Sequence, residues 1–280
     1  MQLTPRYDGP PVLQFVDPPS DLAVPLGRQR RRLGQLLDGL DEAQWATPSR
    51  CEGWTVRDVI AHLVGADRFW AASARSALAG EPTRYLVGFD PVATPAAMVA
   101  GTQEQPAHEV LADYHRAVED LIGAVTALTP EQWAMTAEGP PGHLAMHAIV
   151  RHALWDGWVH ERDVALPVGL DQELHDDELT AALEYAIGLG PGLQASLGST
   201  REGTLAAVAT DLDVELVAEL GSSVLISRRP APEGTPTLRG PAVDLIEGLS
   251  LRAPLHHDLA DEDRWLLAGL AVAFDQESPA

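Results

Sequence analysis

A short repeated pattern constrains the fold of this chain more than any other feature. The segment LLDGLDEAQWATP (36–48) resembles AVTALTPEQWAMT (124–136), and both carry a Gln-Trp-Ala triplet. In each copy a predicted helix ends before the triplet and a histidine-bearing helix follows it, VIAHLVGAD in the first and IVRHALWDG in the second. Two such halves predict a four-helix bundle built from a duplicated hairpin. The repeat is too short to prove duplication, but it places His62 and His152 at corresponding positions.

Four segments with apolar residues at helical spacing supply the helices of this bundle. They cover residues 21–40, 56–78, 107–128 and 143–166. In the second, Thr55 is expected to cap the N-terminus and Asp58 to complete a capping box. Its apolar stripe consists of Val56, Val59, Ile60, Leu63 and Trp70. A loop rich in Gly, Pro and Thr is expected over residues 80–106.

Beyond residue 168 the pattern becomes mixed. Residues 176–193 predict one more helix, and the β-prone runs TLAAVAT, DVELVAEL and SSVLISR follow it. The segments PAVDLIEGLSL and EDRWLLAGLAVAF predict two closing helices. We therefore expect an α+β protein with three parts. These are a proline-rich extended arm over residues 1–20, a four-helix bundle over 21–168 and a small α+β domain over 169–280.

The charge balance excludes several classes of partner. The chain has 41 acidic and 19 basic residues and a formal net charge of −22, whereas nucleic acids and anionic membranes require a basic footprint. The one basic cluster consists of Arg28, Arg30, Arg31 and Arg32. It is interpreted as the solvated face of the first helix. With no signal-peptide pattern and no apolar run of about 18 residues, a soluble cytoplasmic protein is expected, either a monomer or a homodimer.

The absence of lysine and the single cysteine restrict the possible chemistry. Every basic residue is arginine, which excludes Schiff-base chemistry, pyridoxal phosphate attachment and a phosphate loop of the lysine type. Cys51 alone cannot form a disulfide framework or a cysteine-rich zinc site. The sequence GLGPG at 188–192 follows no predicted strand, so it is not interpreted as a phosphate loop.

Three polar side chains form the strongest candidate site. Asp156 and His160 are four residues apart, so on a helix they project from one stripe about 40° apart, and His62 would come from a second helix. Two imidazoles and a carboxylate suit a divalent metal with open coordination positions. Burying them would be costly unless they are paired or metal-bound. From spacing alone, a metal site and a structural His–Asp pair are equally supported.

Three neighbouring residues have alternative interpretations. His152 competes for a ligand role, or it contacts the substrate or a ligand side chain. Asp163 is expected either to hold an imidazole or to cap the end of its helix. Cys51 lies near the first histidine, although a free cysteine is more often a small buried hydrophobic residue.

The segment CEGWTVRDVIAHLVG, the D-x-x-x-H pair followed by Asp163, and the two QW turns resemble the mycothiol-dependent maleylpyruvate isomerase family, which belongs to the DinB-like superfamily. The segment RGPAVDLIEGLSLR followed by LAGLAVAFD resembles that family's sterol-carrier-like C-terminal domain. The resemblance covers nearly the whole chain beyond residue 20. It implies a DinB-like four-helix bundle holding one divalent metal, commonly Zn²⁺, on His62, Asp156 and His160. The best-known members often have Glu at the position of Asp156.

The resemblance also implies mycothiol as a thiol co-substrate. A divalent cation favours the thiolate, which adds to a small electrophile and gives either cis–trans isomerisation or a stable S-conjugate. The resemblance implies an arginine of the second domain that binds a substrate carboxylate, with Arg252 the closest match and Arg239 the second. We expect a catalytic role for His152 and Arg252 and a cofactor contact for Arg239. The family's usual Gly-Arg is Leu-Arg at Arg252, which puts a dicarboxylate substrate in doubt.

The expected function is therefore a metal- and thiol-dependent isomerase or S-transferase, with a small-molecule substrate and a low-molecular-weight thiol as partners. One alternative is an enzyme of specialised metabolism that keeps the bundle and does not use mycothiol. The other is a non-catalytic small-molecule-binding protein. Metal analysis combined with a thiol-binding assay separates the three.

Overall fold

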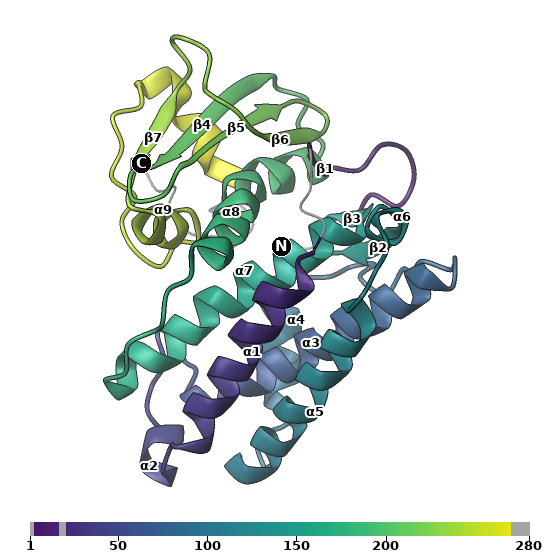
Figure 1. Ribbon diagram of the computed structural model, residues 1–280, viewed down its shortest axis with the longest axis vertical. Helices are drawn as coiled ribbons and strands as arrows, with labels where there is room; N and C mark the ends of the chain where they lie inside the picture. Colours follow the sequence, from purple (N-terminus) through teal and green to yellow (C-terminus); the bar gives the residue numbers. More distant parts are fainter. Residues whose placement is uncertain (1–2, 17–20, 270–280) are drawn as a thin grey trace.

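The computed structural model describes residues 3–16 and 21–269 and has an α+β architecture. A helical bundle lies at one end of the molecule and a mixed sheet at the other (Figure 1). The long bundle helices are α1 (Ala23–Asp38), α3 (Val56–Leu78), α5 (Ala107–Val125) and α7 (Met146–Ala165). They form a ring in which α1 and α3 each pack against both α5 and α7. The predicted α+β class is confirmed.

Each copy of the QW repeat forms a single-turn helix between two long ones, and in the second copy a short hairpin also precedes the next long helix. These helices are α2 (Glu42–Trp45) and α6 (Pro130–Trp133). Both begin with a capping box in which the glutamine of the triplet bonds back to the cap residue, Asp41 with Gln44 and Thr129 with Gln132. The tryptophan of each triplet is buried. The repeat therefore combines a helix-start signal with an apolar anchor.

Helix α3 follows its sequence signals closely. Thr55 is the N-cap and forms the expected capping box with Asp58, and all five residues of the predicted apolar stripe are buried. The helix places His62 beside this stripe, half-buried and directed toward α7. Local capping and apolar spacing are sufficient to fix this half of the candidate site.

Two predicted boundaries are wrong. The fourth bundle helix begins at Met146, not at residue 143, because residues 142–145 form strand β3 (Gly142–Ala145), which pairs with β2 (Thr136–Gly139). The predicted loop over residues 80–106 contains a further helix, α4 (Ala93–Ala100), which packs on α3.

The interpretation of the arginine cluster as a solvated face holds for Arg31, which is exposed and pairs with Glu119. It is wrong for Arg30 and Arg32. Arg30 is fully buried and forms an ion pair with Asp67 of α3 at 3.0 Å. Arg32 binds Glu161 and Glu178, whose side chains are almost fully buried. Carboxylates from distant segments converge on this helix, and they provide the pairing that buried guanidinium groups require.

The C-terminal half contains helix α8, a five-stranded sheet and two short helices. In chain order these are α8 (Asp176–Ser196), β4 (Gly203–Ala209), β5 (Val214–Leu220), β6 (Val224–Arg228), β7 (Thr237–Gly240), α9 (Ala242–Leu249) and the 3-10 helix η2 (Asp261–Leu267). The last predicted helix is 3-10 over residues 261–267, and the part of that prediction beyond residue 269 lies outside the described residues. A second 3-10 turn, η1 (Leu166–Val168), joins the two halves.

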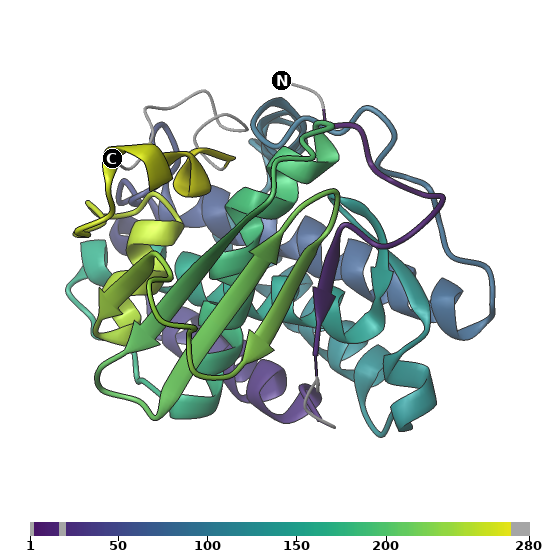
Figure 2. The same ribbon diagram turned by 90° about the horizontal axis from the view of Figure 1, so that it is seen from above.

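The sheet has the order β1-β6-β5-β4-β7, with antiparallel pairs in the centre and parallel pairs at both edges. The predicted N-terminal arm supplies edge strand β1 (Leu13–Phe15), which pairs with β6, so the arm and the C-terminal half contribute to one sheet (Figure 2). Helix α8 packs on β5 and β6. Gly188, in the GLGPG sequence, permits this approach, because a Cβ there would lie 2.7 Å from Leu13 and 2.8 Å from Ile226.

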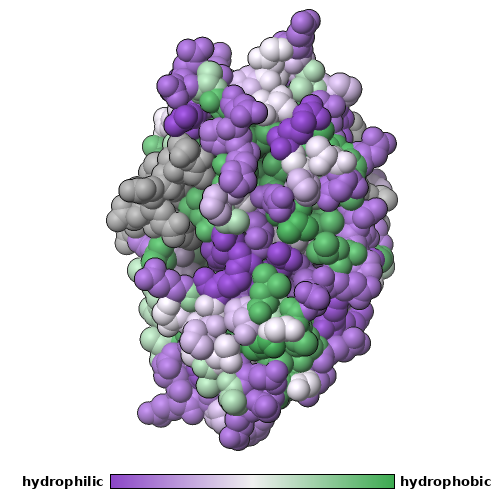
Figure 3. Space-filling view, turned by 90° about the vertical axis from the view of Figure 1, so that its left-hand side faces the viewer, coloured by the Kyte–Doolittle hydropathy of each residue, from purple (hydrophilic) through white to green (hydrophobic). Residues whose placement is uncertain are grey.

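The bundle and the sheet share an apolar cluster, and a second buried cluster lies within the bundle alone. A continuous cluster of buried side chains runs from α3 and α7 through α8 to the inner face of the sheet. On the face shown in Figure 3, hydrophilic side chains gather at mid-height, where the bundle meets the sheet-bearing half. Within the described part of the chain, no helix has the length and hydropathy needed to cross a membrane.

Candidate metal centre

The structure brings the three predicted ligands together between α3 and α7. His62 Nε2 lies 3.9 Å from Asp156 Oδ1, and His160 Nε2 lies 3.5 Å from the same oxygen. One donor atom from each residue falls within 4.8 Å of the others. Their side chains are between 10% and 17% exposed, so the group is sheltered but reachable from solvent. A nitrogen–nitrogen–oxygen set of this size matches the donors that a Zn²⁺ site uses.

Electrostatics keep the carboxylate of this group ionised. Burial raises the pKa of the Asp156 carboxyl, but the adjacent imidazoles of His160 and His62 lower it by more, so its pKa lies well below the ordinary value. An ionised carboxylate is the form that ligates a cation.

Asp163 supports the site from behind His160. Its carboxylate is fully buried and lies 3.0 Å from His160 Nδ1. Burial raises the pKa of Asp163, whereas the bond to His160 and the charge of Arg252 lower it to about 2. An ionised Asp163 accepts a hydrogen bond from Nδ1–H, which leaves the Nε2 lone pair of His160 free on the side of Asp156. Asp163 was expected either to hold an imidazole or to cap the end of its helix, and in the structure it holds the imidazole of His160.

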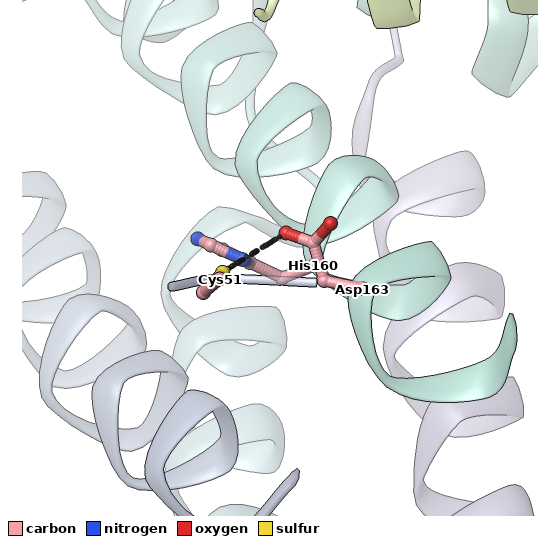
Figure 4. Close-up of side chains that lie close together, drawn as sticks. All are labelled: Cys51, His160 and Asp163. Carbon is pink, nitrogen blue, oxygen red and sulfur yellow. Dashed lines mark hydrogen bonds and ion pairs between the residues drawn. The ribbon is translucent and has the colours of Figure 1, made fainter. Parts of the chain in front are cut away.

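Cys51 joins the same cluster from the loop before α3 (Figure 4). Its Sγ donates to Asp163 Oδ2 at 3.2 Å and lies 3.7 Å from His160 Nδ1. Burial, and next the negative charge of Asp163, raise the pKa of the Cys51 thiol to about 12. The thiol is therefore a neutral donor at physiological pH, not a nucleophile.

Cys51, His160 and Asp163 form a second group whose donor atoms lie close together. The Arg252 guanidinium already provides a positive charge beside this group. Its Nε lies 3.0 Å and 3.1 Å from the Asp163 oxygens, and its Nη2 lies 3.6 Å from Cys51 Sγ. A metal ion there would have to share the anionic partner with a fixed cation. The group of His62, Asp156 and His160 is therefore the better candidate for a metal.

Three residues that the sequence did not single out connect the halves beside this site. Glu247 of α9 accepts hydrogen bonds from Arg50 at 2.6 Å and from Arg162 at 2.7 Å. Arg50 Nη2 also donates to the backbone oxygen of Arg252. The sequence offered one hint of this contact, because Arg50 directly precedes Cys51. It offered none for Glu247, which is nearly two hundred residues away.

His152 lies one turn before Asp156 in an aromatic enclosure. Its ring centroid is 4.7 Å from that of Trp70, 5.5 Å from Trp155 and 4.6 Å from Tyr185. The Tyr185 hydroxyl lies 2.6 Å from His152 Nδ1, and burial lowers the pKa of His152 to about 4. Nδ1 of a neutral His152 accepts a hydrogen bond from the Tyr185 hydroxyl, so the imidazole carries its own proton on Nε2.

Arg239, the predicted cofactor contact, lies exposed on β7 opposite Val208 of β4. Among the described residues it forms no hydrogen bond or ion pair with His62, Asp156 or His160. Arg252 lies at the site, but its guanidinium faces Asp163. The structure therefore brings together four of the six predicted site residues, places His152 directly beside them and leaves Arg239 apart.

Residues 26–165, which are 140 of the 280, match the sequence profile of the mycothiol maleylpyruvate isomerase N-terminal domain. The chain belongs to this family. The matched region of this family member spans the ring of helices and all three candidate ligands. No curated protein sequence matches the chain.

Two solved structures resemble this family member in fold. One is a crystal structure of the mycothiol-dependent maleylpyruvate isomerase, with 14% sequence identity, and the other is a mutant form with 13%. Each aligns over 83% of this chain and 88% of the solved chain with a TM-score of 0.58. The alignment extends beyond the matched N-terminal region, so the resemblance includes much of the sheet-bearing half. At this identity it establishes the fold alone.

Proposed function

We propose that this protein is a metal-dependent enzyme that uses an exogenous low-molecular-weight thiol to isomerise a small electrophile or to form an S-conjugate with it. The observation that carries the proposal is the convergence of His62, Asp156 and His160 in a member of this family. Because the similar solved structures are described as mycothiol-dependent, mycothiol is the proposed thiol.

In this proposal His62, Asp156 and His160 hold a divalent cation, and the donor set favours Zn²⁺. When bound, the cation lowers the pKa of the co-substrate thiol and so favours its nucleophilic form. The protein keeps the metal-ligating atoms in the orientation and protonation state that metal binding requires. Asp163 fixes the tautomer and the orientation of His160, and the depressed pKa of Asp156 keeps that carboxylate charged.

The chain's own thiol does not compete for this role. Cys51 is engaged by Asp163 and carries a raised pKa of about 12, so it stays protonated while an external thiol reacts. The reaction forms a bond between sulfur and an electrophilic carbon, and the thiol proton passes to the substrate. Elimination after bond rotation returns the thiol and gives an isomer, whereas retention of the bond gives a conjugate.

The environment of Arg252 supports a substrate other than a dicarboxylate. In the resemblance this arginine binds a substrate carboxylate, but here its Nε faces Asp163. A carboxylate ligand would have to compete with a fixed, fully buried partner. We therefore propose an electrophile whose recognition does not depend on a free Arg252.

Metal content tests this function. The purified protein is expected to bind close to one equivalent of Zn²⁺, and His62→Ala is expected to lose it because one of three ligands is removed. His115→Ala is a matched control, because His115 is an exposed histidine that pairs with Asp38. A protein that keeps its fold but binds no metal would contradict the site.

The thiol requirement is tested separately. Turnover of model electrophiles is measured by the metal-loaded protein with and without mycothiol. We expect turnover with mycothiol alone, and appearance of either the isomer or the conjugate decides between the two reactions. Equal turnover without the thiol would contradict the proposal and identify a thiol-independent enzyme.

A further inference from the structure

Arg252 and Asp163 form a buried contact between the two halves of the molecule. Asp163 belongs to α7, and Arg252 follows α9 in the C-terminal half. Three side chains hydrogen-bond to the Asp163 carboxylate: His160 at 3.0 Å, Arg252 at 3.0 Å and Cys51 at 3.2 Å. The Arg50 guanidinium lies farther away, with Nε 3.9 Å from Asp163 Oδ1. Since Asp163 is fully buried, each of the three hydrogen-bond donors restricts the rotation of its carboxylate.

The backbone before Arg252 adopts a conformation that its sequence disfavours. Leu251 has φ 56°, in the left-handed region that residues other than glycine rarely adopt. The amide of Arg252 then donates to the carbonyl of Glu247 at 2.8 Å, which closes the end of α9. This turn carries the chain back toward α7 and directs Arg252 at Asp163. Strain at such a position is evidence that the surrounding contacts require it.

We propose that Arg252 is a positioning residue that acts through Asp163 to orient His160 for the metal. This inference rests on the proposed function, because it assumes that His160 is a ligand. Arg252 holds the Asp163 carboxylate in place from the C-terminal half, and Asp163 in turn holds His160 Nδ1. The ligands lie in the bundle, but the metal affinity of the site depends on the C-terminal half.

A double-mutant cycle on the full-length metal-free protein tests this, with Zn²⁺ affinity measured by competition against a chromophoric chelator. Arg252→Gln and Asp163→Asn are each expected to weaken Zn²⁺ binding by about 10- to 100-fold, as loss of a partner that orients a ligand does. The double variant is expected to bind no more weakly than Asp163→Asn alone, because Arg252 acts through Asp163. Additive losses would overturn the inference.

Arg162→Gln is the matched control. The Arg162 guanidinium forms an ion pair between the halves with Glu247. Among the described residues, it forms no hydrogen bond or ion pair with the Asp163 carboxylate. The control variant should leave Zn²⁺ affinity unchanged, and a loss equal to that of Arg252→Gln would show that general docking of the halves is responsible and would overturn the inference. If Arg252→Gln does not fold, Arg252→Lys takes its place in the cycle, since lysine keeps the charge but not the planar guanidinium contacts. If the Arg252 variant binds Zn²⁺ as tightly as the wild type, the role of Arg252 is overturned but the proposed function is not. If the wild-type protein itself binds no Zn²⁺, both are overturned.

Discussion

At the scale of single residues, burial and one neighbouring charge decide the chemistry of each group in the site. Cys51 and Asp163 share a hydrogen bond, yet they shift in opposite directions: the pKa of the thiol is raised to about 12 and that of the carboxyl is lowered to about 2. Both shifts leave a neutral donor facing an anionic acceptor. The pair is stable in this form across the physiological pH range.

The state of Cys51 predicts slow chemical modification. At pH 8 a pKa near 12 reduces its thiolate fraction about a thousandfold relative to an ordinary thiol. Alkylation by iodoacetamide should therefore be slow in the folded protein and should become fast after unfolding in urea. Mass spectrometry of the alkylated protein over time measures both rates. Equal rates in the two states would show that Asp163 does not hold the thiol protonated.

The sequence predicted the ligands for a physical reason and missed their supporting residues for another. Asp156 and His160 are four residues apart, so helix geometry alone places them together. His62 corresponds to His152 in the repeat, and family resemblance placed it at the site. Glu247 could not be predicted, because its contact with Arg50 depends on how α9 packs on the bundle.

At the scale of helices, one glycine determines how closely α1 and α7 pack. Gly157 of α7 lies against Arg30 of α1, and a Cβ at this position would overlap the guanidinium and lie 2.7 Å from Gln29 Oε1. Arg30 is fully buried and donates to Asp67 and to the backbone oxygen of Ala153. The guanidinium cannot move away without losing these partners.

Gly157→Ala is therefore expected to lower the free energy of unfolding by at least about 3 kcal/mol, since it displaces a buried ion pair. Gly123→Ala on α5 is the matched control, because nothing lies within 4 Å of a Cβ there. It should raise the free energy of unfolding by about 0.5–1 kcal/mol through helix propensity. Urea unfolding of both variants measures the difference, and similar effects in the two would contradict the packing argument.

Local sequence signals predicted the helices well. The features that they did not predict have a common cause. The capping boxes of α2, α3 and α6 depend on residues three apart, so they can be read from the sequence. Strand β3 and the buried arginines of α1 depend on partners far along the chain. Arg32, for example, binds Glu161 and Glu178, and no sequence pattern near Arg32 predicts these partners.

At the scale of the whole molecule, the N-terminal arm holds the bundle and the sheet together. Strand β1 pairs with β6, and the Phe15 ring lies beside His147 and under the Arg151 guanidinium of α7. Arg151 also forms a buried ion pair with Glu184 of α8 at 2.7 Å. A residue of the arm thus lies within a charged network that joins both halves. The sequence predicted an extended arm but not its strand partner.

His147 makes this junction sensitive to acid. Burial, and then the charge of Arg151, lower its pKa from 6.5 to about 4. Between these values the unfolded chain binds more protons than the folded one, so the free energy of unfolding falls as the pH falls from 6.5 toward 4. His147 is only 7% exposed, and its contribution over this range is at most about 3 kcal/mol.

His147→Asn removes this titration but keeps a polar acceptor near Arg151. The stability of the variant should therefore depend less steeply on pH between 6.5 and 4 than that of the wild type, whatever its stability at pH 7. Urea unfolding of both proteins at several pH values measures the two slopes, and His152, whose pKa is also about 4, contributes equally to both. Parallel curves would show that His147 is not held neutral, and that the contact between the arm and the bundle is not the acid-sensitive part of the junction.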